Sequence, residues 1–332
     1  MVKILNKSSK EFKKINVLII GFNRSDFILK SINRLKSINE VEIWISIDGP
    51  RKFNKKDLEE IKIIKDICTY KKIKTQNCKF NNSNLGCRKG VIDSINWFFD
   101  NVEYGIILED DIELEKNYIF QINYWLEKYS KEKSIGSISS HNSINSLNNA
   151  KYGKDFFLMP TCRVWGWATW KDRWNSHIKS TVQLEKLNLL QIFFKTPKKV
   201  RTFNSAMTIW KCLNNEFDTW DYEWNFFHIL KEKKSITPQN FYALNHGFRK
   251  DATHTFIGNN PWVEMDNFKF SKQKKIDLTN STNPKLEKII LSECGFPIME
   301  NYFLEILKLI KFILKNYKNK LLGNLFIKKI NF

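Results

Sequence analysis

The sequence lacks the glycine-rich phosphate loops that mark two large classes of nucleotide-binding enzymes. The first apolar segment, residues 17–22, leads directly into Asn23-Arg24, with neither a G-x-G-x-x-G nor a Walker A pattern. Those loops bring backbone N–H groups close to the phosphates of a dinucleotide or a triphosphate. Their absence argues against a dinucleotide-dependent dehydrogenase and against a P-loop ATPase.

Paired cysteines are lacking too. The six cysteines are scattered, and none forms a Cys-x-x-Cys pair or has a histidine at metal-ligand spacing beside it. This pattern predicts reduced thiols in a cytosolic chain. Residues 1–16 are polar and rich in lysine, so no secretory signal is expected, and no uncharged apolar run is long enough to cross a membrane.

Acidic residues are few relative to basic ones. Lysine and arginine number 55 against 35 aspartates and glutamates, which gives the 332-residue chain a formal net charge of +20. The excess predicts anionic partners, which could be nucleotides, anionic lipid headgroups or nucleic acid. A hydrophobic fraction of 42% and an aromatic fraction of 14% indicate a folded protein of enzyme size rather than a disordered chain.

The chain does contain a regular alternation of apolar strands and amphipathic helices. Strands are predicted at 17–22, 41–47, 73–80 and 106–108, with helices at 26–35, 55–70 and 87–99 between them. Such alternation predicts an α/β fold with a Rossmann-like, mostly parallel sheet flanked by helices. Functional sites of such sheets lie at the carboxyl ends of the strands. A helix at 115–129 and strands at 134–140 and 156–160 are predicted further on.

Acidic residues gather at the predicted strand ends. The apolar run 106–108 is followed at once by Glu109-Asp110-Asp111, and the second strand is followed by Asp48. Adjacent carboxylates repel one another, so such a cluster persists mainly where water or a cation neutralises it. A divalent metal that carries a phosphate suits this position, and an exposed acidic turn is the alternative.

Two segments of the second half mix charged and aromatic residues. Asp221 precedes a predicted helix at 225–230, where its carboxylate suits a general base and, equally, a helix cap. The loop 245–255 combines glycine, basic, hydroxyl and histidine side chains, which suits a loop that folds over a diphosphate or a solvated basic turn.

Four tryptophans lie within residues 165–174. Trp170 and Trp174 are expected in an aromatic core. Trp165 and Trp167, on either side of Gly166, suit a core patch and the wall of a sugar site equally well.

The last segment, 301–332, alternates lysines with leucine, isoleucine and phenylalanine. An amphipathic basic helix of this kind favours contact with an anionic membrane surface, and packing onto the body of the protein is the alternative.

Taken together, these motifs resemble the nucleotide-sugar-dependent glycosyltransferases of the GT-A type. The likeness is to the family of N-acetylglucosaminyltransferase I and the related bacterial glycan and lipopolysaccharide transferases, and it covers residues 16–256. The motifs that match, in order, are Asn23-Arg24, Asp48-Gly49, Glu109-Asp110-Asp111, Trp220-Asp221, and Phe248-Arg249-Lys250 with Thr253-His254.

The resemblance implies a role for each matching residue. Asp111 would bind Mn²⁺ or Mg²⁺, with His254 as a further ligand. Asp110 would lie near the ribose, Glu109 near the hydroxyls of the donor sugar, and Asp48 would accept a hydrogen bond from uracil. Arg24, Arg88, Arg249 and Thr253 would contact the nucleotide or its phosphates. Asp221 would be the catalytic base, with Glu223 as its rival.

We therefore predict a metal-dependent, inverting glycosyltransferase that moves a sugar from a UDP-sugar to a hydroxyl of a glycan or lipid-linked acceptor, in surface polysaccharide or lipopolysaccharide synthesis. A polar lead is expected at 1–15 and a GT-A-like catalytic domain at 16–260, divided into a nucleotide-binding half (16–115) and an acceptor half (116–260). A basic helical tail at 261–332 would attach the cytoplasmic protein peripherally to the inner face of the membrane.

Two other classes remain as alternatives. A GT-A-like sugar nucleotidyltransferase would be expected to carry a glycine-rich, basic loop after the first strand, and Gly21-Phe22-Asn23-Arg24 is too sparse for one. A non-enzymatic nucleic-acid-binding protein would explain the charge of +20 but not the acids at the strand ends, so no nucleic acid partner is expected.

Overall fold

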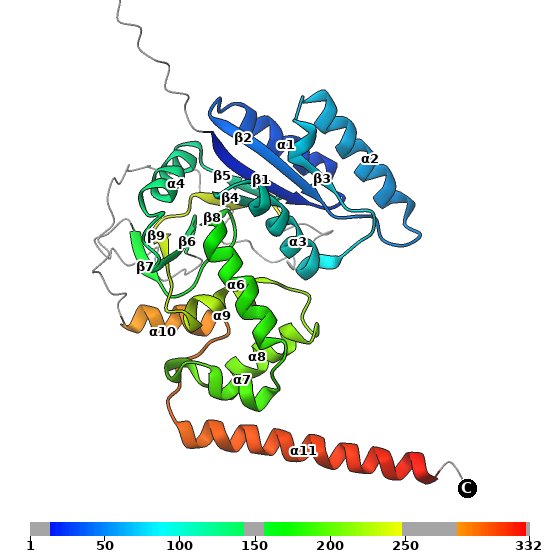
Figure 1. Cartoon of the computed structure of the whole chain (residues 1–332), viewed down its shortest axis with the longest axis vertical. Coiled ribbons are helices and arrows are strands. Elements are labelled where there is room, and N and C mark those ends of the chain that lie inside the picture. The colour runs from blue at the N-terminus through cyan, green and yellow to red at the C-terminus, as the bar shows by residue number, and fades with distance from the viewer. Residues whose placement is uncertain (1–13, 143–155, 248–283, 330–332) are drawn as a thin grey trace, which may run out of the picture.

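A computed structural model describes residues 14–142, 156–247 and 284–329 of the chain (Figure 1). Its strands are β1 (Ile15–Gly21), β2 (Val41–Ile47), β3 (Cys78–Phe80), β4 (Tyr104–Glu109), β5 (Ile112–Leu114), β6 (Ile135–Ser139), β7 (Phe156–Met159), β8 (Trp167–Trp170), β9 (Lys234–Pro238) and β10 (Ala243–Asn245). Its helices are α1 (Ser25–Lys36), α2 (Lys55–Tyr70), α3 (Gly86–Asn101), α4 (Lys116–Lys128), α6 (Lys171–Leu184), α7 (Leu189–Lys195), α8 (Phe203–Leu213), α9 (Asp221–Leu230), α10 (Pro284–Glu293) and α11 (Tyr302–Lys329).

The centre of the fold is a sheet of eight strands in the order β3-β2-β1-β4-β8-β6-β9-β7. The first four of these are parallel neighbours, which confirms the predicted sheet. β8 runs antiparallel to both β4 and β6, β9 is parallel to β6, and β7 closes the far edge antiparallel to β9. β5 and β10 form a separate antiparallel pair. The order and direction of the strands are consistent with a GT-A-like fold.

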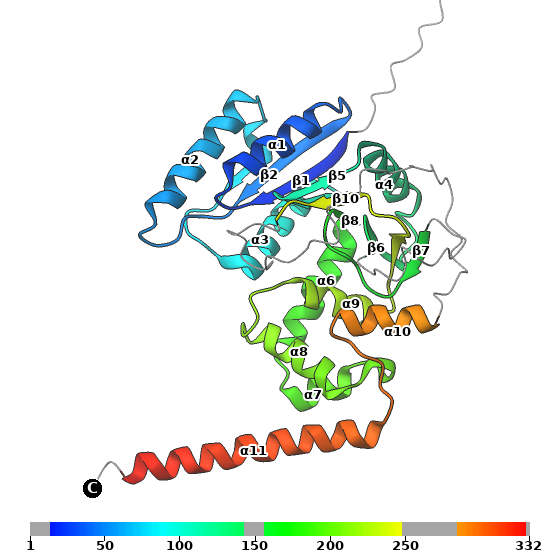
Figure 2. The ribbon, with the colours of Figure 1, turned by 180° about the vertical axis from the view of Figure 1, so that it is seen from behind.

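Both faces of the sheet are covered, which explains the continuous apolar runs of the inner strands. In β1, Val17 and Ile19 belong to one core cluster, whereas Leu18 and Ile20 belong to the cluster on the other face. Helices α1, α2 and α4 pack on the first face, and α3, α6 and α9 pack on the second (Figure 1, Figure 2). Each fully buried aliphatic side chain contributes about 1.5–3 kcal/mol to folding.

A third core cluster belongs to a helical unit below the sheet (Figure 1). It joins α7, α8 and α9 to α10 and the start of α11, through residues such as Phe193, Ile209, Phe296 and Leu309. The beginning of the tail thus packs onto the body, as one of the two readings of the sequence allowed. None of the described helices is long and apolar enough to cross a membrane.

The strands predicted from the sequence differ from those of the structure at three places. The predicted strand 73–80 begins as a 3-10 turn at Thr75–Asn77, and only β3 is extended. The strand β8 was not predicted, because its four residues are all buried and the sequence indicated only an aromatic patch. The small β5–β10 sheet was missed because each of its strands has only three residues.

Candidate functional site

The acidic triplet forms the turn that joins β4 to β5, at the carboxyl edge of the parallel strands. β4 ends at Glu109, and Ile20 of β1 is its partner in the neighbouring strand. Arg24, just beyond β1, forms an ion pair with Asp110 and lies with its Nη1 3.1 Å from Oδ2 of Asp111. Two of the strand-end loops predicted from the sequence are therefore joined by direct contact.

Negative charge is concentrated and poorly hydrated at this turn. Burial raises the pKa of Glu109 to about 8, with further contributions from Asp111 and Asp110 and an opposing one from Arg24. Asp110 is only 3% exposed, and burial raises its pKa in the same direction against the charge of Arg24. One guanidinium does not fully compensate three carboxylates, so an added cation would be favourable here.

The acidic turn could supply a divalent cation with one available carboxylate oxygen. Oδ1 of Asp111 is buried and has no hydrogen-bond partner among the described residues, so it is an acceptor that a metal could use. Within the part of the chain that the structure describes, no group of three or more His, Cys, Asp or Glu side chains is arranged to hold a metal. A metal at Asp111 would therefore rely on substrate phosphates, as Mg²⁺ commonly does when it is bound through one or two carboxylates.

His246 and Gly247, the last described residues before the gap at 248–283, lie beside Asp111. The backbone N–H of His246 donates to the carbonyl of Asp111 at 2.9 Å, and a Cβ on Gly247 would collide with the Asp111 carboxylate. Arg249, Thr253 and His254 lie outside the described residues, so their predicted contacts with the diphosphate and the metal stay predictions.

The carboxylate of Asp48, which follows β2, is hydrogen-bonded to the loop that leads into α3. Its carboxylate accepts from the backbone N–H groups of Gly49, Leu85 and Gly86 at 2.8–3.2 Å and from the side-chain amide of Asn84 at 2.9 Å. These bonds hold the loop 81–86 at the edge of the sheet. The predicted hydrogen bond to uracil stays a prediction, and Asp48 has the separate task of ordering this loop.

A second carboxylate completes the start of α3. The capping position of this helix is Leu85, whose side chain has no acceptor. Asp218 takes that role from 130 residues away, because it accepts from the N–H groups of Cys87 at 3.1 Å and Arg88 at 2.8 Å. Together, Asp48 and Asp218 tie both halves of the chain to one helix end. We call this arrangement of two carboxylates on residues 85–88 the α3 clamp.

Arg88 turns its side chain toward α6 and α9. Its Nε lies 2.5 Å from Oε1 of Glu223, and its other nitrogens reach Asn215 at 3.1 Å and Glu185 at 3.2 Å. Both Arg88 and Glu223 are buried. Burial raises the pKa of Glu223, whereas the guanidinium of Arg88 lowers it. The two predicted site residues thus form a buried ion pair with each other.

Asp221 is the first residue of α9 and is only half-buried. The hydroxyl of Thr219 donates to its Oδ1. Its charge is the smallest of the contributions that raise the pKa of Glu109. Trp220, not Asp221, occupies the capping position of the helix.

Cys87 lies in the first turn of α3, where its backbone N–H donates to Asp218, and no local sequence pattern marks it as a site residue. Burial, together with smaller contributions from the charges of Glu109, Asp218, Asp221 and Asp48, raises the pKa of Cys87 to about 12. The charges of carboxylates at the ends of β2 and β4 and at the start of α9 thus act on one half-buried thiol. We call this region, residues 24, 48, 87, 109–111 and 221, the acidic edge.

The two tryptophans beside Gly166 have different surroundings. Trp167 is 1% exposed and stacks on Trp220 at 5.4 Å, so it belongs to the core. Trp165 is half-buried, and its ring stacks on that of His141 at 4.9 Å. Trp165 is the one of the pair that retains a surface on which a sugar could stack.

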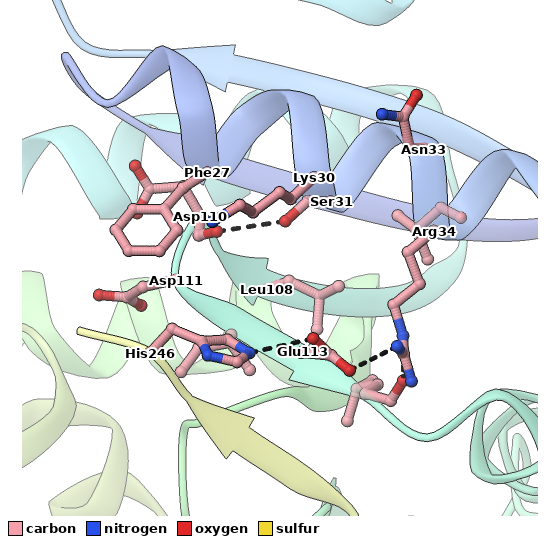
Figure 3. A pocket seen from close by; sticks show the side chains of 13 residues that line it. Phe27, Lys30, Ser31, Asn33, Arg34, Leu108, Asp110, Asp111, Glu113 and His246 are labelled. Atoms are coloured by element: carbon pink, nitrogen blue, oxygen red, sulfur yellow. Dashed lines mark hydrogen bonds and ion pairs between the residues drawn. The ribbon is translucent and has the colours of Figure 1, made fainter. Parts of the chain in front are cut away.

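A cavity of about 320 Å³ lies between α1 and the β4–β5 turn (Figure 3). Asp110 and Asp111 line one end, and Phe27, Lys30 and Ser31 of α1 line its wall. At the other end Glu113 binds both Arg34 and His246, with 3.0 Å to Nε2 of the histidine. The acidic edge is thus bordered on its α1 side by a space of the size of a small ligand.

Comparisons with known proteins add little to this geometry. No protein-family model matches the chain, and no curated protein matches it either. Among solved structures, the chain is similar to the apo form of the glycosyltransferase GlyE of Streptococcus pneumoniae TIGR4, with 11% identity and a TM-score of 0.26. The match covers 62% of this chain and 44% of that one, so it spans less than half of the neighbour.

Proposed function

We propose that the protein is a metal-dependent, inverting glycosyltransferase that transfers a sugar from a nucleotide-sugar to a hydroxyl of a glycan acceptor. The observation that carries this proposal is the acidic edge itself. It collects a buried acidic turn, a cationic partner for that turn and a half-exposed carboxylate from the other half of the chain at the carboxyl end of a parallel sheet. This is where open α/β sheets bind their ligands.

The donor diphosphate is assigned to the β4–β5 turn. Asp111 would hold Mn²⁺ or Mg²⁺ through its unpaired Oδ1, and the metal would neutralise the departing nucleoside diphosphate. Arg24 keeps Asp110 in place and lends its charge to the same region. Glu109 is the last residue of β4 and precedes Asp110 directly, and we assign it to the hydroxyls of the donor sugar.

Asp221 is the better candidate for the base. Glu223 is 4% exposed and bound to Arg88, so an acceptor hydroxyl could reach it only after the ion pair broke. Asp221 is half-exposed and forms no ion pair among the described residues. We assign it to remove the proton of the acceptor hydroxyl while that oxygen attacks the anomeric carbon from the side opposite the leaving group.

The finer assignments follow the resemblance rather than any contact. The donor would be UDP-linked, and the acceptor would be a glycan or a lipid-linked saccharide of surface polysaccharide or lipopolysaccharide synthesis. The protein would be located at the inner face of the cytoplasmic membrane. The net charge of +20 favours anionic substrates and surfaces of this kind.

Thermal unfolding in the presence of nucleotides tests the proposal without a known acceptor. UDP with Mn²⁺ should stabilise the wild-type protein by about 2.7 kcal/mol at 100 times its dissociation constant. Asp111→Asn should lose this effect, and Asp66→Asn, a matched change on the exposed side of α2, should keep it. The donor-site assignment fails if no nucleotide raises the midpoint with either metal, or if Asp111→Asn responds like the wild type.

A further inference from the structure

The long helix α11 has one face that packs onto the body. Glu305 and Leu309 are 9% and 1% exposed, and Oε2 of Glu305 accepts from the backbone N–H of Phe203 at 2.7 Å. The ring of Phe312 lies 5.5 Å from that of Phe203. These contacts fix the rotation of the helix about its own axis, because only one face can touch α8.

The opposite face of α11 is apolar and open to solvent. Phe303, Leu307, Ile310 and Leu314 recur every third or fourth residue, so they form one stripe, about half a turn from Leu309. Phe303 is 68% exposed, Ile310 45% and Leu314 61%, and Leu307 between them is half-buried. We call these four residues the outer stripe. An apolar row of this regularity on a solvent-exposed face indicates a binding surface rather than scattered surface hydrophobes.

Lysines accompany the outer stripe along one side. Lys308, Lys311 and Lys315 are all exposed and follow one another at the same helical spacing. Lys308 reaches Glu305 at 2.6 Å, whereas Lys311 and Lys315 have no ion-pair partner among the described residues. The surface therefore combines an apolar row with uncompensated positive charge.

The position of the helix adds a further constraint. α11 has 28 residues and runs past the helical unit that its first turns contact, as the red helix at the end of the molecule in Figure 1 shows. Isolated helices are marginal in water, and most helical stability in proteins comes from the packing of an apolar face. A partner for the outer stripe would supply that stability.

We propose that the outer stripe lies in the interfacial layer of an anionic lipid bilayer, with the axis of α11 parallel to the surface. Lipid tails would take up the four apolar side chains and anionic headgroups would pair with the lysines, so one partner accounts for both features. A second copy of the chain would bring lysine rows of like charge together, and a nucleic acid would leave the apolar row in water. The inference gives the membrane location included in the proposed function a defined surface, and it does not depend on the transfer reaction.

Sedimentation of the full-length protein with lipid vesicles tests this inference. The protein should bind vesicles of equal parts phosphatidylglycerol and phosphatidylcholine, and bind phosphatidylcholine alone much more weakly. Changing Phe303, Ile310 and Leu314 together to Gln should lower the affinity at least about tenfold. Changing Lys311 or Lys315 to Gln should lower it about fivefold each, and high salt should imitate that loss.

Matched controls separate binding from folding. Tyr70→Gln removes an aromatic ring that is 79% exposed on α2, and its vesicle binding should equal that of the wild type. The triple variant should keep the wild-type unfolding midpoint, because its three side chains face away from the body. The proposal is overturned if the wild type does not bind anionic vesicles or if the triple variant binds them equally well. It is also overturned if the triple change abolishes self-association or RNA binding instead. UDP-dependent stabilisation is measured separately, so either proposal can fail alone.

Discussion

At the scale of single residues, the contrast between Asp221 and Glu223 determines which carboxylate can exchange a proton with substrate. The first is reachable from the acidic edge, and the second is enclosed with Arg88. The guanidinium of Arg88 occupies an oxygen of the buried Glu223 carboxylate and shields it from an incoming hydroxyl. We therefore regard Glu223 as a residue that positions α9 and, with it, Asp221.

Two conservative changes distinguish these roles. Asp221→Asn should lower kcat for UDP release with a glycan acceptor by about 10²–10⁴-fold and leave KM for the donor nearly unchanged, because it removes the base. Glu223→Gln should mainly lower the unfolding midpoint, because Arg88 then loses its buried carboxylate partner and keeps only the more exposed Glu185. If Glu223→Gln instead abolished turnover in a protein of unchanged stability, the assignment would have to be reversed.

At the scale of secondary-structure elements, the α3 clamp replaces a local cap by two distant carboxylates. Asp218→Ala should destabilise the protein by about 1 kcal/mol, because the N–H groups of Cys87 and Arg88 lose their acceptor. The measurement is chemical denaturation of the full-length protein.

Asp100→Ala serves as the control at the other end of the same helix. Asp100 is exposed near the last carbonyls of α3, where a negative charge is unfavourable, so its loss should not lower stability. Equal losses in the two variants would show that the effect of Asp218 does not come from capping.

The elements also show what a single sequence can and cannot reveal. β1, β2 and β4 were predictable because each is a buried apolar run, and the acids behind them followed from the edge at which parallel strands end. The ion pair of Arg88 with Glu223 joins residues 135 apart in the sequence, and the hydrogen bond of Arg88 to Asp218 joins residues 130 apart. No local sequence spacing predicts contacts between residues so far apart. β8 could not be predicted, because its four residues are all buried and so show no alternation of apolar and polar side chains. It also runs antiparallel to β4, whereas the alternation of strands and helices predicts parallel strands.

At the scale of the whole molecule, three buried histidines make stability depend on pH. Burial lowers the pKa of His141 and His177 to about 3 and that of His228 to about 4. Between pH 6.5 and 4 the unfolded chain binds protons that the folded protein does not, so stability falls as the pH falls through this window. Each histidine contributes up to about 1.4 kcal/mol per pH unit.

His228→Asn provides the corresponding variant. Nδ1 of His228 lies 3.0 Å from the carbonyl of Trp224, and the amide of Asn can keep that bond without the ability to take up a proton. Denaturation measured from pH 7 to 5 should show a slope that is shallower by about one proton. An unchanged slope would mean that His228 does not titrate in the unfolded chain as assumed.

The α3 clamp has a further consequence for the order in which the protein is made. Residue 48 and the start of α3 leave the ribosome long before residue 218, so a nascent chain that ends anywhere between them has only one of its two carboxylates. Its first three parallel strands can already pair, but the helix end at the acidic edge stays incomplete. The part of the protein that we expect to handle substrate is therefore finished only after most of the chain has been synthesised.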